Sequence, residues 1–211
     1  KAQTTKQASE ESSENEKRRL SQIEASTHLE NYTYKDSEEN VATVPAGFAV
    51  SNVEGENLVS KGLVIIGTNG NEYVWIPCTE DTYKREESAW WIEDDNGTRA
   101  IKDELTLTGA TPSDVESTNG ITTEVLTEIV KQVQNEIISV KNNGGYYIGR
   151  YEVGKENNNT IIKASQEPYA SIRWSQAYEL AKKIDVGTKA NSYLCSSYAW
   201  DTAVNFIKTH S

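Results

Sequence analysis

The strongest constraint on the fold lies in residues 62–78, where two apolar runs, GLVIIG and EYVWIPC, flank the polar stretch Thr68-Asn69-Gly70-Asn71. An Asn-Gly pair supplies the positive φ angles that a tight hairpin turn demands. The segment therefore predicts two antiparallel strands joined by a short turn. A further apolar run, VPAGFAVS at residues 44–51, predicts another strand just before them.

A long amphipathic helix is predicted over residues 123–141. Its apolar side chains recur at i, i+3, i+4, i+7, i+11 and i+14, which places them on one face that packs on a core. Thr122 or Thr123 can cap the first turn, and the stretch Asn142-Asn143-Gly144-Gly145 supplies left-handed residues to end the helix. The apolar stripe consists of Leu126, Ile129, Val130, Val133, Ile137 and Val140.

The last third of the chain alternates between strand and helix patterns. Residues 146–153 (YYIGRYEV) predict a strand, residues 160–163 (TIIK) predict a short partner for it, and Asn157-Asn158-Asn159 predicts the connecting turn. Residues 175–184 and 197–208 predict two helices, each with a serine at its start. Together with the hairpin and the long helix, these elements predict an α+β fold.

Residues 1–40 are rich in Ser, Glu, Lys, Gln and Ala, with Leu20, Ile23 and Leu29 as their only large aliphatic residues. Such a segment cannot bury a face of its own, so we expect a polar helix of marginal autonomous stability. It is either a disordered tail or the soluble end of a longer helix whose apolar beginning has been removed. The predicted organisation is a polar amino-terminal helix at residues 1–40 and an α+β head at residues 41–211, with a surface insertion around 79–120.

Charge and composition exclude some classes of partner. The chain has 211 residues, with 32 acidic and 21 basic side chains and a formal net charge of −11. A field of that sign repels nucleic acid and anionic lipid heads. Five Trp and eleven Tyr nevertheless indicate a folded body. No apolar run reaches half of a membrane span, and the chain begins with Lys1 and contains no Met, so we expect a mature or fragmentary form without membrane association.

The sequence carries no recognisable catalytic or metal-binding motif. His28 and His210 lie toward the two ends of the chain, which argues against Ser-His-Asp, Cys-His and histidine-metal sites. The acidic stretch EDDNGTR (93–99) lacks the alternating ligands of a calcium loop and predicts a solvated turn. Neither of the glycine-rich phosphate-binding patterns, G-x-x-x-x-G-K-[ST] and G-x-G-x-x-G, occurs in the sequence. We therefore predict no catalytic, cofactor-binding or metal-binding residues, no cofactor, and a protein that is not an enzyme.

Two features invite a functional interpretation but are more often structural. Glu152 near Arg150 would suit a catalytic carboxylate held by an ion pair, yet such pairs usually satisfy themselves at a strand edge. Trp174 and Trp200, near the heads of the last two predicted helices, would suit a ligand-stacking platform, yet such indoles usually wedge a helix against a sheet. We favour the structural interpretation of both features.

Cysteines and glycosylation sequons leave alternatives open. Cys78 and Cys195 exclude a disulfide-rich scaffold and a four-cysteine zinc site. They are consistent with one long-range disulfide and with two separate buried thiols, and we favour the thiols. Sequons at Asn31, Asn96 and Asn158 would matter only in a eukaryotic secretory setting.

Three segments, in this order, carry a resemblance to a known family: GGYYIGRYEVG, PYASIRWSQAYELAKKI and SYLCSSYAWDTAVNFI. They resemble the first three signatures of the formylglycine-generating enzyme family and its non-catalytic relatives, whose fold is a divergent C-type lectin fold. The matching stretches are 145–153, 168–177 and 192–203, and the third departs clearly from the family pattern. The resemblance implies a truncated C-type-lectin-like head, because the family's catalytic cysteines and much of its metal-binding carboxylate set follow the third signature. It therefore carries over no functional residue.

Residues 47–78 resemble the opening hairpin of a subgroup of that family found on bacterial cell surfaces and in phage. Members of that subgroup often follow a prepilin-type helix, and residues 1–40 resemble the polar end of a type IV pilin-like helix. The resemblance implies an extracellular, cell-surface filament subunit, with a pilin-like stalk remnant that binds copies of itself or other pilin-like subunits. Two alternatives are a formylglycine-generating-type enzyme fragment lacking its catalytic half, and a phage or cell-surface adhesin-like domain that binds a protein or glycan ligand.

Overall fold

The computed structural model describes residues 2–85, 123–156 and 159–210. Helices and antiparallel sheets are both present, so the fold is α+β as predicted. The chain divides into two compact units, each assembled from three separate stretches. Unit 1 comprises Lys1–Pro77, Tyr147–Ala170 and Lys183–Ser192, and unit 2 comprises Cys78–Tyr146, Ser171–Lys182 and Tyr193–Ser211.

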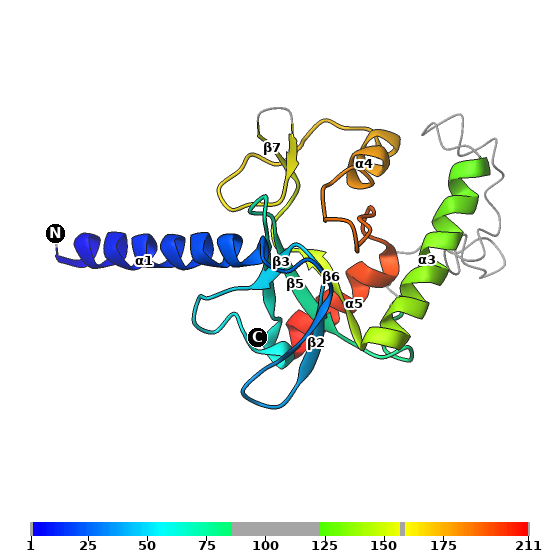
Figure 1. The fold of residues 1–211 in the computed structure, drawn as a ribbon. Helices are drawn as coiled ribbons and strands as arrows, with labels where there is room; N and C mark the ends of the chain where they lie inside the picture. The colour runs from blue at the N-terminus through cyan, green and yellow to red at the C-terminus, as the bar shows by residue number, and fades with distance from the viewer. Residues whose placement is uncertain (1, 86–122, 157–158, 211) are drawn as a thin grey trace. The chain divides into compact units, whose positions relative to one another are not determined.

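Unit 1 begins with a long helix and continues with antiparallel strands (Figure 1). Strands β1 and β2 form a hairpin, and β7 and β8 form a second ribbon. The main sheet has the strand order β3-β4-β5-β6, and β6 carries the chain from unit 2 into unit 1. These elements are α1 (Ala2–Ala25), β1 (Tyr32–Lys35), β2 (Val41–Val44), β3 (Phe48–Val50), the 3-10 turn η1 (Val59–Lys61), β4 (Val64–Gly67), β5 (Glu72–Pro77), β6 (Gly145–Gly149), β7 (Gly154–Glu156) and β8 (Asn159–Ile161).

The predicted hairpin at residues 62–78 is confirmed as β4 and β5, in which Val64 pairs with Val74. Gly70 takes the expected positive φ, at +80°. Asn69 contributes differently from the prediction, because its side chain accepts a hydrogen bond from the Asn71 amide at 3.0 Å. The turn therefore uses one left-handed glycine and one side-chain bond, as asparagines in turns often do.

The apolar core of unit 1 joins the main sheet to the hairpin β1–β2. Trp75 of β5 is 2% exposed and packs on Tyr147, with ring centroids 4.9 Å apart. The Tyr147 hydroxyl donates to the Thr43 carbonyl of β2 at 3.0 Å. The buried members of this core are aliphatic and aromatic residues from seven parts of the chain: Ala42, Val44, Phe48, Val59, Leu63, Ile65, Tyr73, Trp75, Ile162 and Ile184.

Unit 2 contains the helices α3 (Thr123–Asn143), α4 (Trp174–Ala181) and α5 (Ser197–His210). The predicted stripe of α3 faces the core, because Val133 and Val140 are 0% and 1% exposed. The helix ends as predicted at Gly144, whose φ is +76° and whose amide donates to the Val140 carbonyl at 2.7 Å. The small core of unit 2 consists of Cys78, Tyr83, Val140 and Ala199.

The amino-terminal helix is shorter than the prediction of residues 1–40. It ends at Ala25, and the hydroxyls of Ser26 and Thr27 donate back to the carbonyls of Ile23 and Glu24, at 2.6 and 2.7 Å. Such bonds compete with the helical backbone ladder. The aromatic and β-branched residues of YTYK and VATV then favour strands, which is why β1 occupies part of a segment predicted to be helical and pairs with β2 just after it.

Three further predictions are corrected in detail. The strand predicted at residues 146–153 ends at Gly149, and β8 pairs with the separate strand β7 rather than with β6. Helix α4 starts without a serine cap, since the amide of Arg173 is bound by the Gln176 side chain at 3.0 Å. Of the surface insertion predicted around 79–120, the structure describes residues 79–85, where a turn buries Tyr83. The remainder, with Trp90 and Trp91, lies outside the described residues.

Candidate functional site

The carboxyl-terminal turns of α1 dock on unit 1 through small and polar side chains. Arg18, Ser21, Gln22 and Ala25 recur at i, i+3, i+4 and i+7, so they share one face of the helix. Ser21 and Ala25 are 0% and 1% exposed. Ser21 Oγ accepts a hydrogen bond from the Asn52 amide at 2.9 Å, and Gln22 Nε2 donates to a carbonyl of the β4–β5 turn at 2.6 Å. This docked face packs against β3 and β4.

Four charged residues, Arg18, Glu56, Glu72 and Arg150, fix the docked face to the sheet, and we call them the charge cluster. Arg18 Nη2 lies 2.6 Å from Glu56 Oε1, and its Nη1 lies 2.8 Å from Glu72 Oε2. Arg150 reaches the same carboxylates, with Nη2 2.7 Å from Glu56 Oε1 and Nη1 3.0 Å from Glu72 Oε2. Ser51 Oγ donates to Glu56 Oε2 at 2.6 Å. Each guanidinium bridges both carboxylates, so two positive and two negative charges balance.

Backbone pairing places two members of the charge cluster side by side. The Glu72 amide donates to the Ile162 carbonyl at 2.9 Å, and the Glu72 carbonyl accepts from the Arg150 amide at 3.0 Å. The exposed fractions of the four side chains are low, from 7% for Glu72 to 25% for Arg150. Charge-assisted hydrogen bonds are stronger than neutral ones, and partial burial reduces their screening by salt. The cluster can therefore hold a helix that has no apolar face toward the sheet.

The two carboxylates of the charge cluster respond differently to their surroundings. Burial opposes ionisation of Glu56, but hydrogen bonds from Arg18, Arg150 and Ser51 outweigh it and lower the pKa of Glu56. Burial dominates at Glu72 and raises its pKa despite the charges of Arg18 and Arg150. Burial would lower the pKa of Arg150, but its bond to Glu56 raises it instead. Glu56 is therefore the carboxylate that both arginines hold most firmly in its charged form.

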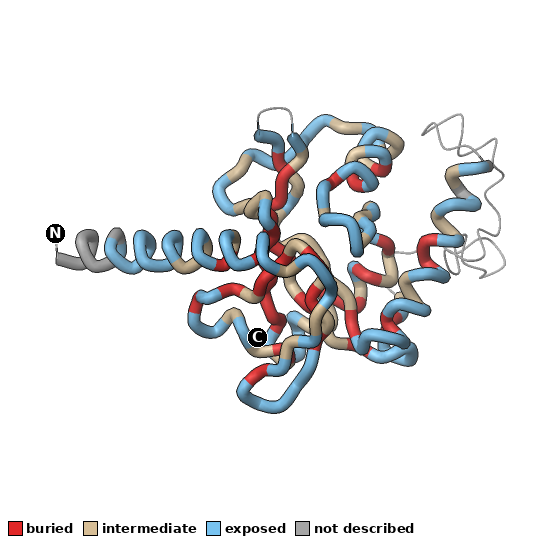
Figure 2. The backbone as a smooth tube through the Cα atoms, viewed as in Figure 1, coloured by how far each residue is buried: buried red, intermediate tan, exposed pale blue. Residues whose placement is uncertain are grey.

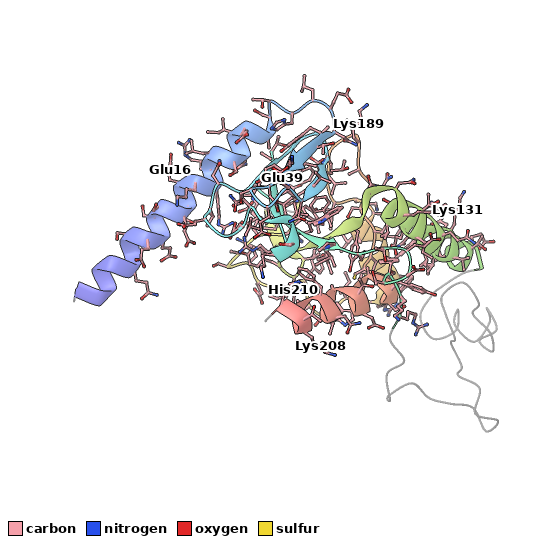
Figure 3. All side chains as sticks on the ribbon, turned by 90° about the horizontal axis from the view of Figure 1, so that it is seen from below. Glu16, Glu39, Lys131, Lys189, Lys208 and His210 are labelled. Atoms are coloured by element: carbon pink, nitrogen blue, oxygen red, sulfur yellow. The ribbon has the colours of Figure 1, made fainter. Side chains whose placement is uncertain are left out.

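The opposite face of α1 carries the large aliphatic residues of the helix. Leu20 and Ile23 are 46% and 52% exposed, and they lie one turn apart. Figure 2 shows the described part of α1 as exposed along most of its length. Between the aliphatic residues and the amino terminus, Arg19 Nη2 pairs with Glu16 Oε1 at 2.6 Å on the helix surface, where Figure 3 labels Glu16. Helix α1 thus buries polar residues and exposes aliphatic ones.

Unit 2 has its own buried polar network, centred on Glu136 of α3. Its Oε2 accepts hydrogen bonds from the Tyr83 hydroxyl at 2.6 Å and from Ser196 Oγ at 2.7 Å. Its Oε1 accepts from Gln132 Nε2 at 2.7 Å. Burial, and then the nearby Glu136 carboxylate, raise the pKa of Tyr83. The hydroxyls of Tyr83 and Ser196 both donate to the Glu136 carboxylate, so the network joins α3 to the residue just before α5. We interpret it as a structural network.

The sequence suggested an ion pair between Arg150 and Glu152. In the structure Glu152 is exposed, and Arg150 belongs to the charge cluster, where it pairs with Glu56 and Glu72. Trp174 is half-buried and stacks on Tyr178, with centroids 5.1 Å apart. Trp200 is 60% exposed, so its predicted role as a core wedge is wrong. The indole of Trp200 instead lies on the surface of α5.

Both cysteines are free thiols, with Cys78 buried and Cys195 exposed. Burial raises the pKa of Cys78 to about 12, which leaves it uncharged and unreactive at neutral pH. His28 stacks on Tyr32, with centroids 4.1 Å apart, and His210 stacks on Phe206 at 4.3 Å.

Of the three sequons, only Asn31 is described, and its Oδ1 accepts a hydrogen bond from the Ala46 amide at 3.0 Å. Asn96 and Asn158, like the acidic stretch at 93–99, lie outside the described residues.

Comparisons of the chain with protein-family models, with curated proteins and with solved structures give no match. Within the described residues, no group of three or more His, Cys, Asp or Glu side chains is arranged to hold a metal ion. In the same part of the chain, no helix has both the length and the apolar character needed to cross a membrane.

The sequence contains a signal for the charge cluster, although its residues form no recognised motif. Glu72 stands at the head of the apolar run EYVWIPC, and Arg150 stands within YYIGRYEV. A charged residue in a strand that is otherwise buried requires a partner of opposite charge. The identity of the partners, Arg18 and Glu56, depends on tertiary pairing across long separations in sequence.

Proposed function

We propose that this chain is a non-enzymatic extracellular subunit of a pilin-like filament, in which α1 is the assembly helix and a C-type-lectin-like head is displayed to solvent. The observation that carries the proposal is the orientation of α1. The helix docks on its own head through Arg18, Ser21 and Ala25 and exposes Leu20 and Ile23 on the opposite face.

A surface helix that serves only its own domain turns its aliphatic residues toward the core. Helix α1 does the reverse, which leaves Leu20 and Ile23 for burial against another chain. The acidic head, with a chain charge of −11, favours solubility and repulsion between heads outside the contact. Neighbouring copies of α1 are therefore the proposed partners of the aliphatic face.

A filament subunit must also transmit load from its assembly helix to its head. The charge cluster supplies that connection, because Arg18 alone makes three hydrogen bonds to Glu56 and Glu72. Support for the lectin-like head comes from three segments that resemble family signatures, which overlap β6, α4 and α5 in part. We assign the head a display role, which is consistent with the hydrogen bond between Tyr83 and Glu136 and with the raised pKa of the buried Cys78 thiol.

The test is filament imaging in the source cells with an antibody to the head. Filaments containing this chain are expected for the natural sequence and should disappear for the double variant Leu20→Asp with Ile23→Asp. The matched control is Ile138→Asp on α3, which introduces the same charge at a side chain of similar exposure, 56%. The control variant should assemble normally.

Circular dichroism and thermal unfolding of the purified variants separate lost assembly from lost folding. Two results would contradict the proposal. One is unchanged filaments in the double variant, and the other is a natural protein found only as cytosolic monomers.

A further inference from the structure

Helix α5 carries an apolar stripe that its own unit does not cover. Trp200, Val204 and Ile207 recur at i, i+4 and i+7, which places them on one side of the helix. Trp200 and Ile207 are each 60% exposed. The face toward the core is separate and consists of small residues, with Ala199, Thr202 and Ala203 buried. Val204, between Trp200 and Ile207, is half-buried. Exposed apolar side chains that gather on one side of a helix and include a tryptophan are typical of a protein contact surface.

Two opposite charges flank this stripe on one side. Asp201 and Lys208 are seven residues apart, so they lie two turns apart along the same flank of α5. Figure 3 labels Lys208 near the carboxyl end of the helix. Val204 lies close to the midpoint of the two charges and also close to the midpoint of Trp200 and Ile207. The centres of the apolar pair and of the charged pair therefore lie within one residue of each other.

We propose that α5 is a self-association surface on which a second copy of the chain packs its own α5 in antiparallel orientation. A two-fold axis near Val204 places Trp200 of one copy against Ile207 of the other. The same axis places Asp201 opposite Lys208 twice, whereas a parallel two-fold arrangement would put the charged flanks of the two copies on opposite sides of the contact. Such an isologous contact requires a surface that is complementary to itself, which the sequence of α5 provides.

This surface belongs to unit 2 and does not depend on α1 or on the proposed filament. Three side chains and two charge pairs make a smaller contact than the 1,200–2,000 Å² of a standard stable interface, so the dimer is weak, and association must be measured up to about 1 mM protein. Dimerisation through α5 is therefore measured on the purified protein in solution, whereas the filament proposal is tested by imaging in cells.

The first test is sedimentation equilibrium of the full chain and its variants. A concentration-dependent monomer–dimer equilibrium is expected for the natural sequence. Trp200→Ala should raise the dissociation constant about 30-fold, as truncation of a central tryptophan does at a hot spot. Ile207→Ser, a milder change at an exposed side chain, provides a second measurement if the tryptophan variant folds poorly.

Charge reversal tests the orientation. Asp201→Lys and Lys208→Asp should each raise the dissociation constant about tenfold, because each change puts like charges opposite one another twice. The double variant Asp201→Lys with Lys208→Asp should return the dissociation constant to that of the natural chain, since the two ion pairs are then re-formed with exchanged signs. Rescue of this kind is specific to an antiparallel contact between identical helices.

A cross-linking test locates the axis. In a Cys195→Ser background, Val204→Cys should form a disulfide-linked dimer under mild oxidation, and Thr209→Cys, on another side of the same helix, should not. The proposal is overturned by a chain that stays monomeric to the highest concentration. It is also overturned by singly reversed variants that are not rescued in the double variant, or by a dimer that Leu20→Asp with Ile23→Asp abolishes while the α5 variants leave it intact.

Discussion

Helices α1 and α3 are similar in length, with 24 and 21 residues, and are attached to their units in opposite ways. Helix α3 turns Val133 and Val140 into the core of unit 2. Helix α1 turns Ser21 and Ala25 toward the sheet of unit 1 and relies on the charge cluster for specific bonds. The attachment of α3 is chiefly apolar, with the Glu136 network beside it, whereas the attachment of α1 depends on the charge cluster.

The difference has consequences for how each helix can be released. Burial of aliphatic side chains changes little with pH or moderate salt, because no charge is involved. A partly buried charge cluster weakens when one carboxylate is protonated, and its exposed edge is screened by salt. Helix α1 can therefore be loosened under conditions that leave α3 in place.

Val133→Asp should have the largest effect, because it puts an unpaired carboxylate at a position that is 0% exposed. We expect unit 2 to lose about 4 kcal/mol or more of unfolding free energy. Urea unfolding gives the energy, and alkylation of the buried Cys78 thiol reports the loss of packing around α3. Ile138→Asp is the control on the same helix, and alkylation of Cys78 as slow as in the natural chain would contradict the prediction for Val133→Asp.

Arg18→Met should have the next largest effect, because it removes the helix's contribution to the charge cluster while keeping the length of the side chain. Breaking a fully buried ion pair costs about 3–5 kcal/mol, and the 19% exposure of Arg18 reduces the expected loss to about 2 kcal/mol. Hydrogen exchange should accelerate for the amides around Ser21, while the amides of β4 and β5 keep their protection. Equal acceleration in the strands would show that α1 and the sheet unfold as one.

Glu56→Gln should cost more stability at neutral pH than Glu72→Gln. Glu56 accepts bonds from Arg18, Arg150 and Ser51, and its lowered pKa means that the folded state favours its charged form. Burial raises the pKa of Glu72, so folding does not favour the charged form of this side chain, and its replacement by a neutral glutamine should cost less. Thermal unfolding at pH 7 compares the stability of the two variants. A larger loss of stability in Glu72→Gln than in Glu56→Gln would contradict this prediction.

The same pair of variants should separate in acid. Glu56 has a lowered folded-state pKa, so its stabilisation is complete above the ordinary value of 4.5 and is lost as the pH falls through the lowered value. Glu72 has a raised pKa, so its contribution is complete below 4.5 and is lost as the pH rises through the raised value. When the free energy of unfolding is measured against pH, Glu56→Gln should reduce its dependence on pH below 4.5. Glu72→Gln should reduce its dependence on pH just above 4.5.

Arg19→Ala should have the smallest effect and serves as the counterpart of Arg18→Met. Arg19 pairs with Glu16 on the solvent side of α1, where the side chains are 58% and 54% exposed. Exposed pairs of this type contribute little to stability. The midpoint of thermal unfolding should match that of the natural chain, and a clear decrease would mean that the two faces of α1 are not as different as the contacts indicate.

Local patterns were sufficient to predict the hairpin β4–β5 and helix α3, because each combines a strong apolar period with its own turn or capping residues. The hairpin β1–β2 was missed, since its polar surroundings resembled the preceding helix in composition and its apolar residues, such as Val44, are few. Strand β7 was missed because Gly154 and its exposed neighbours carry no alternating pattern. These elements are stabilised by tertiary pairing, which a local pattern does not record.

The charge cluster illustrates a different limit. A strand glutamate such as Glu72 signals that a cation is required, but the sequence contains 21 candidates. The choice of Arg18 and Arg150 is made by the path of the backbone, through the bond between the Arg150 amide and the Glu72 carbonyl. The exposed position of Trp200 was likewise unpredictable from spacing, because the helix α5 buries small residues instead.

The interleaving of the two units affects how the protein can be made and shortened. Three stretches of one unit alternate with three of the other, so the polypeptide passes between them five times. The core that holds Ala42 and Trp75 also needs Ile184, which comes from the last of the three stretches of unit 1. Neither core can close before its last stretch has been synthesised, and no single truncation would release either half as an intact product.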